Sequence, residues 1–153
     1  MKIEQILFPT DFSEGSYHAL PYAVDFSKHY NAKLYILHII HDFTKATYSH
    51  IFHMYSDKIL DDITAWARNE IDKCCNEQIR ELSNVEIFIL KGIPYEEIVK
   101  FADNKKIDII VMGTYGRIGL DKLMFGSTAE RVVRKAPCPV LTVRQPEHQK
   151  NNV

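Results

Sequence analysis

The sequence predicts a doubly wound α/β domain, in which a five-stranded parallel sheet carries helices on both faces. Short apolar runs alternate along the chain with longer amphipathic stretches, which is the pattern of β-α-β units. Two of these runs, residues 34–37 and 109–112, are continuously apolar, as strands covered on both faces are. The length of 153 residues is that of one domain.

Five strands follow from the apolar runs. We expect them at residues 3–9, 33–40, 85–90, 108–112 and 139–144. The last strand, from Pro139 to Arg144, comes late in the chain, and we expect it at an edge of the sheet. A bare edge strand invites pairing with another chain.

The amphipathic stretches predict four helices, at residues 13–30, 57–82, 94–103 and 127–136. Ser13 is the expected N-cap of the first helix, and Pro94 stands in the first turn of the third. Ser127 and Glu130 form an S-x-x-E capping box at the start of the last helix. Pro21 lies inside the first helix and removes a hydrogen bond there, so we expect a kink or a restart at this residue.

The domain is expected to cover residues 1–144, followed by a polar C-terminal tail at 145–153 that frays. The three cysteines, Cys74, Cys75 and Cys138, are odd in number and lack a disulfide or C-x-x-C pattern, so we expect reduced thiols. Of the adjacent pair, one is expected to pack in the core and the other to lie near the surface.

The charge balance disfavours several classes of partner. Nineteen basic and twenty acidic side chains give a formal net charge of −1, which provides no general attraction to nucleic acid or to an anionic membrane. No apolar run approaches the roughly 18 residues of a membrane span, so we expect a cytoplasmic protein. Residues 113–144 carry six basic and two acidic side chains, which either attract phosphate or form a solvated helix face.

The most informative segment has the spacing G-x2-G-x9-G-S, directly after one buried strand and before the last helix. Its glycines are Gly113, Gly116 and Gly126, and Ser127 and Thr128 add hydroxyls. At the end of a parallel strand, glycine lets the backbone approach a ligand, and amides at a helix N-terminus bind anions. We therefore expect a polyphosphate here. The alternative is that the glycines serve turns and Ser127 only caps the helix.

A second candidate segment ends the first strand at Pro9, Thr10 and Asp11. In a doubly wound sheet, ligands sit at the strand ends where the strand order reverses, so the two segments are expected to meet. Asp11 would then face a ribose or a metal. The alternative is that Asp11 is a capping carboxylate ahead of Ser13.

Two histidine pairs have a spacing that could place two imidazoles on a metal, His38 with His41 and His50 with His53. His38 belongs to a predicted strand whereas His41 follows it, and no carboxylate or cysteine completes a metal pattern. The alternative is that His50 and His53 share one face of a short helix near the ligand or a dimer edge.

Several of these segments together resemble the universal stress protein family, in its ATP-binding branch. The resemblance is carried by Pro-Thr-Asp-Phe-Ser at 9–13, Leu-His-Ile at 37–39, the glycine-rich spacing, and Ala-Pro-Cys-Pro-Val-Leu at 136–141. It spans residues 3–144. It implies a Rossmann-like fold of the adenine nucleotide alpha hydrolase type, and a twofold homodimer formed through the fifth strand.

The same resemblance implies a binding role for each residue of the site. The adenine would lie near Ile39 and the Pro9-Thr10 turn, the ribose near Asp11 and Gly113, and the phosphates along Gly116, Gly126, Ser127 and Thr128. Met112 and Tyr115 would line the pocket. Mg²⁺ or Mn²⁺ would bridge the phosphate oxygens.

The sequence lacks the P-loop, the G-x-G-x-x-G turn and the H-E-x-x-H helix, so fast phosphoryl transfer lacks its usual groups. The leading hypothesis is an ATP-binding stress-response module with little or slow hydrolysis. The alternatives are a slow ATPase or nucleotide-dependent transferase, and a protein-interaction dimer with a vestigial pocket. We expect Gly113→Val or Gly126→Val to abolish nucleotide binding and leave a folded protein.

Overall fold

The computed structural model describes residues 2–41, 56–114 and 126–144, with the backbone alone at 56–60, 74 and 76. The sheet has five strands: β1 Gln5–Thr10, β2 Lys33–His41, β3 Val85–Gly92, β4 Ile109–Gly113 and β5 Val140–Val143. Their order is β3-β2-β1-β4-β5, and every neighbouring pair is parallel. The predicted fold class is confirmed, and β5 lies at an edge as expected.

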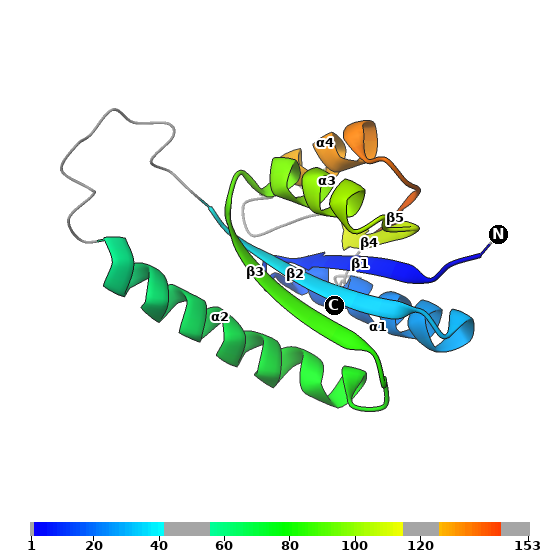
Figure 1. Ribbon diagram of the computed structural model, residues 1–153, viewed down its shortest axis with the longest axis horizontal. Coiled ribbons are helices and arrows are strands. Elements are labelled where there is room, and N and C mark those ends of the chain that lie inside the picture. The colour runs from blue at the N-terminus through cyan, green and yellow to red at the C-terminus, as the bar shows by residue number, and fades with distance from the viewer. Residues whose placement is uncertain (1, 42–55, 115–125, 145–153) are drawn as a thin grey trace, which may run out of the picture.

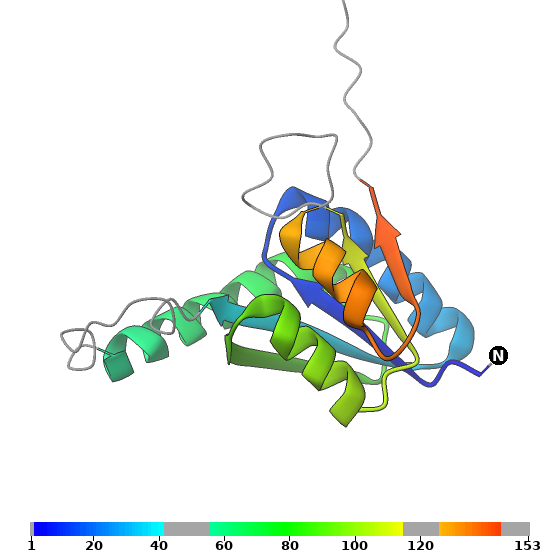
Figure 2. The same cartoon turned by 90° about the horizontal axis from the view of Figure 1, so that it is seen from above.

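Four helices cover the sheet: α1 Glu14–Tyr30, α2 Ser56–Ile79, α3 Pro94–Asn104 and α4 Ser127–Lys135. Figure 1 shows α3 and α4 on one face of the sheet and α1 and α2 on the other. Seen from above in Figure 2, α3 and α4 lie side by side over the strands. The chain therefore has three layers, and a connection leaving a strand can pass to either face.

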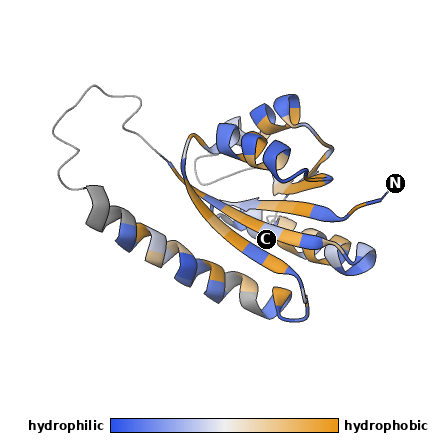
Figure 3. Cartoon of the chain, in the orientation of Figure 1, coloured by the Kyte–Doolittle hydropathy of each residue, from blue (hydrophilic) through white to orange (hydrophobic). Residues whose placement is uncertain are grey.

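Each face of the sheet has its own hydrophobic core. Ile6, Phe8 and Val111 pack toward α1 and α2, whereas Leu7 and Ile110 pack toward α3 and α4. Successive side chains of a strand point to opposite faces, so a strand buried on both sides must be apolar throughout. Figure 3 shows this concentration of hydrophobic residues in the strands, with hydrophilic residues on the outer surfaces of the helices.

Cys75 of α2 is fully buried in the core between the sheet and helices α1 and α2. This confirms that one of the adjacent cysteines packs inside, while the side chain of Cys74 lies outside the described residues. Cys138 is half-buried, and burial raises the pKa of its thiol. A thiol of this kind stays protonated and weakly nucleophilic at neutral pH.

The structure excludes one of the two outcomes expected at Pro21, the restart of the first helix. Helix α1 runs unbroken from Glu14 to Tyr30, so there is no restart. Pro21 is exposed, so the hydrogen bond that it removes faces water rather than the core. Leu20 and Ala23 on the buried side pack against the sheet and keep the helix continuous.

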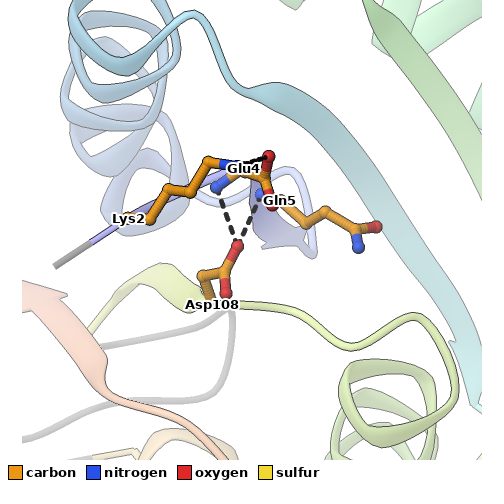
Figure 4. A network of polar contacts seen from close by, with 4 residues as sticks. All are labelled: Lys2, Glu4, Gln5 and Asp108. Carbon is orange, nitrogen blue, oxygen red and sulfur yellow. Dashed lines mark hydrogen bonds and ion pairs between the residues drawn. The ribbon is translucent and has the colours of Figure 1, made fainter.

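The carboxylate of Asp108 links the start of β1 to the start of β4, at the amino ends of these strands. Asp108 Oδ2 accepts hydrogen bonds from the amides of Glu4, at 2.8 Å, and Gln5, at 2.9 Å (Figure 4). These bonds join residues more than 100 positions apart in the chain. They help to hold the register in which Ile6 lies opposite Ile109.

Candidate functional site

The carboxyl ends of β1 and β4 meet at the centre of the sheet. β1 pairs with β2 on one side and with β4 on the other. The chain leaves β1 toward α1 on one face and leaves β4 toward α4 on the opposite face. This is the point of strand-order reversal, where open α/β sheets bind ligands. The structure thus brings the two predicted segments, at Pro9–Asp11 and at Gly113, to the same place.

Three apolar side chains lie at these strand ends, on the face covered by α3 and α4. Met112 is buried in the core of that face, and Ile39 of β2 packs against the same core. Pro9 is buried and lies two residues beyond Leu7, so its ring is on the same face. Because β2, β1 and β4 are neighbours, the three side chains form an apolar floor suited to a flat ring.

The turn between β1 and α1 is held by short side-chain hydrogen bonds. The Thr10 hydroxyl bonds with that of Ser16, at 2.9 Å, and accepts from the amide of Phe12, at 3.1 Å. Asp11 Oδ1 accepts from the amide and the hydroxyl of Ser13, at 3.0 and 2.6 Å. Phe12 is in the left-handed region at φ 63°, which these bonds stabilise.

Ser13 is the N-cap of α1, as predicted, since its hydroxyl accepts from the amide of Ser16 at 3.2 Å. Asp11 acts one step earlier, because its carboxylate orders Ser13 itself. Asp11 thus supports the N-cap through Ser13 and is not itself the cap of the helix. Its contact with a ribose stays a prediction.

His38 supports the same turn from the neighbouring strand. Its Nδ1 donates to the carbonyl of Thr10 at 2.9 Å, and its ring stacks on Phe12 with the centroids 4.4 Å apart. Phe12 in turn meets the edge of Trp66 of α2. The sequence predicts no contact between His38 and Thr10, and the pairing of β1 with β2 reveals it.

The histidine pair His38 and His41 does not converge in the structure. Residues three positions apart on a strand point to opposite faces, and His38 is buried whereas His41 is exposed. Within the described parts of the chain, no group of three or more histidine, cysteine, aspartate or glutamate side chains could hold a metal ion. His50 and His53 lie outside the described residues.

Gly113 is required by the packing of α1. A Cβ atom built on Gly113 would lie 2.4 Å from the carbonyl oxygen of Gly15 and 3.0 Å from the amide nitrogen of Ser16. Both neighbours are backbone atoms, which cannot rotate away. This packing argues against the expectation that Gly113→Val leaves the fold undisturbed, because the added side chain would push α1 away from β4. Contact of Gly113 with a ribose stays a prediction.

The N-terminus of α4 also differs from the prediction. Gly126 is the N-cap, at φ −62° and ψ 144°, and Ser127 is the first helical residue. The carbonyl of Gly126 accepts the first helical hydrogen bond, from the amide of Glu130 at 3.0 Å, so the capping box centred on Ser127 does not form. In the described part of the chain, no side chain caps this helix. Amides in the first turn of a helix are potential donors for an anion.

Thr114 joins β4 to this helix start, and the sequence analysis did not single it out. Its amide donates to the carbonyl of Val143 in β5, at 3.0 Å, and its carbonyl accepts from the amide of Gly126, at 2.9 Å. Thr114 and the N-cap of α4 are therefore in direct contact. Tyr115 and Gly116, which belong to the predicted site, lie outside the described residues.

The described basic residues of α4 lie on its solvent side. Arg131 and Lys135 stand over the ring of Tyr95, at 4.8 and 5.2 Å from its centroid, and Arg134 pairs with Glu130 at 3.0 Å. All three cations are exposed. For these residues the interpretation as a solvated helix face fits better than attraction of phosphate to the strand ends.

No helix in the described ranges is long and apolar enough to cross a membrane. The sequence profile of the universal stress protein family matches residues 2–144. Universal stress protein MJ0531 of Methanocaldococcus jannaschii is 33% identical over 147 residues, which are 95% of this chain and 85% of that protein.

Solved structures share the fold. The structure of MJ0577, from the same organism, superimposes with a TM-score of 0.85 at 30% identity and covers 97% of this chain and 100% of its own. A universal stress protein in complex with cAMP superimposes with a TM-score of 0.66 at 23% identity, covering 94% and 98%. The second likeness is evidence for the shared fold.

Proposed function

Because the chain belongs to the universal stress protein family, we propose that it is an ATP-binding regulatory module of the stress response that hydrolyses ATP slowly or not at all. One observation carries the proposal. An apolar floor and the N-terminus of α4, which no side chain of the described residues caps, meet where the strand order reverses. A flat base and an anionic phosphate are the chemical groups that such a pair of surfaces suits.

We propose one orientation for the nucleotide in this arrangement. The adenine would lie on Pro9, Ile39 and Met112, because these supply the apolar floor. The phosphates would then extend toward the N-terminus of α4, where Gly126 and Ser127 begin the helix. The remaining proposed contacts are Thr10 near the adenine, Asp11 and Gly113 near the ribose, Gly116 and Thr128 at the phosphates, and Tyr115 in the lining of the pocket.

A divalent cation, Mg²⁺ or Mn²⁺, would accompany the phosphates and neutralise part of their charge. The donor set of the protein suits an ion that is bound mainly by the nucleotide. Asp11 supplies the carboxylate at the end of β1, and its Oδ1 already accepts two hydrogen bonds from Ser13. Oxygen atoms of phosphate are the ligands that Mg²⁺ commonly takes in such sites.

We also propose a twofold homodimer through β5. Among the described strands, β5 pairs with β4 alone, so its other edge is open to a partner strand within that part of the chain. Val140, Leu141 and Thr142 are half-buried, which leaves part of their surface for a partner. A second copy can pair with such an edge in an isologous contact. Sedimentation of the protein at low concentration tests this proposal, and a monomer at micromolar concentration would contradict it.

Calorimetry and thermal melting with Mg-ATP test the main proposal. At 100 times its dissociation constant, ATP should stabilise the folded protein by about 2.7 kcal/mol, which raises the melting temperature by about 5–10 °C. Absence of both binding heat and stabilisation would refute ATP binding. Phosphate release above the blank that disappears in Asp11→Ala would instead favour the slow ATPase.

A further inference from the structure

Thr114 carries a buried hydroxyl without a hydrogen-bond partner. The residue is 7% exposed. Among the buried side-chain oxygen and nitrogen atoms of the described residues, its Oγ1 is the one without a hydrogen-bond partner. The other buried hydroxyls of the described residues have partners. Thr10 bonds with Ser16 at 2.9 Å, and Ser27 donates to the carbonyl of Ala32 at 2.7 Å.

An unpaired hydroxyl of this kind destabilises the free protein, because it loses its hydrogen bonds to water and gains none. Valine has nearly the same shape and lacks this penalty. Buried unsatisfied groups are rare, and each one calls for a physical explanation. A ligand that supplies the missing acceptor is one such explanation.

The position of Thr114 indicates which ligand group this is. Thr114 directly follows the last residue of β4, and its carbonyl accepts from the amide of Gly126, the N-cap of α4. It therefore lies between the strand end and the helix N-terminus at which the phosphates are proposed to bind. Amides at a helix N-terminus and a hydroxyl can all donate to a single anionic oxygen.

We propose that the Thr114 hydroxyl donates a hydrogen bond to a phosphate oxygen of the bound nucleotide, which makes Thr114 a residue that distinguishes nucleotides from nucleosides. This inference rests on the proposed ATP binding and adds a residue to the site. The hydroxyl is covered in the free protein, so the bond forms on binding, with rotation about the Cα–Cβ bond between staggered positions. Binding thereby removes an unsatisfied group in addition to adding a contact.

Isothermal calorimetry on Thr114→Val, Thr114→Ser and the unsubstituted protein tests the inference, with Mg-ATP and adenosine as ligands. We expect Thr114→Val to weaken ATP binding by about 10-fold to 100-fold, since hydrogen bonds to charged acceptors are strong. Thr114→Ser keeps the hydroxyl and should bind ATP within about threefold of the unsubstituted protein. Adenosine, which has no phosphate, should bind all three proteins equally.

Thermal melting without ligand provides the second readout. Thr114→Val should melt at least about 2 °C higher than the unsubstituted protein, because it lacks the unsatisfied hydroxyl. A residue with a merely structural hydrogen bond would show the opposite shift. Thr114→Ala, which also removes the hydroxyl, repeats the binding measurement if the valine variant does not fold.

The outcomes separate the two proposals. If the unsubstituted protein binds ATP and the valine variant binds it equally well, the role of Thr114 is refuted and ATP binding stands. If the valine variant loses adenosine affinity as much as ATP affinity, the phosphate assignment is overturned. If the unsubstituted protein binds no ATP, the proposed function fails and this inference fails with it.

Discussion

The contact between Gly113 and helix α1 predicts a large loss of stability from the smallest possible substitution, Gly113→Ala. The added Cβ would lie 2.4 Å from the carbonyl oxygen of Gly15, whereas ordinary contacts begin at 3.4 Å. Helix α1 must therefore move by about 1 Å relative to β4, and overpacking of this kind costs about 2–3 kcal/mol. The melting temperature should fall by about 4–12 °C.

Urea unfolding followed by far-UV circular dichroism measures this loss directly, and Gly126→Ala is the matched control. Gly126 has φ −62°, which any residue adopts, so its substitution should change the unfolding free energy by less than about 1 kcal/mol. A Gly113→Ala variant within about 0.5 kcal/mol of the unsubstituted protein would refute the packing argument. So would a Gly113→Ala variant more stable than the control.

Three further predictions concern the supports of the fold. Asp108→Ala should lower the unfolding free energy by about 1–3 kcal/mol in urea, because two amides at the start of β1 lose their acceptor; an unchanged midpoint would contradict this. His38→Leu should be less stable in urea than His38→Asn, because asparagine keeps a donor for the carbonyl of Thr10. If His38→Asn is the less stable variant, the hydrogen bond to Thr10 is not what makes His38 stabilising. Burial raises the pKa of the Cys138 thiol, so a smaller fraction of it is thiolate at pH 8. Alkylation of Cys138 at pH 8, followed by peptide mass spectrometry, should therefore be slower than alkylation of free cysteine and should accelerate at higher pH. A rate equal to that of free cysteine would contradict the burial argument.

The order of strands and helices could be predicted because it depends on local patterns. The continuous apolar runs at residues 34–37 and 109–112 mark strands that are buried on both faces, and they lie within β2 and β4. Ser13 marks a helix start because its hydroxyl caps an amide in the first turn. Pro94 marks another because proline has no N–H, which the first turn does not need. Such signals require no knowledge of distant contacts.

Where the sequence prediction went wrong, a neighbour distant in the chain decided the outcome. Pro21 does not interrupt α1, because the sheet packs against the buried side of the helix and the proline faces water. The capping box at Ser127 does not form, because the chain enters the helix one residue earlier, with the Gly126 amide bound to Thr114. Both elements were located correctly, but their details depend on tertiary packing.

The sequence alone determined that glycine and hydroxyl residues follow two strand ends, and hence which segments to examine for a ligand. Only the tertiary structure showed that Gly113 is pressed against Gly15, that His38 holds the carbonyl of Thr10, and that Thr114 has a buried hydroxyl without an acceptor. Residue type and spacing specify which backbone conformations are allowed. Which atoms then touch depends on strands brought together from distant parts of the chain.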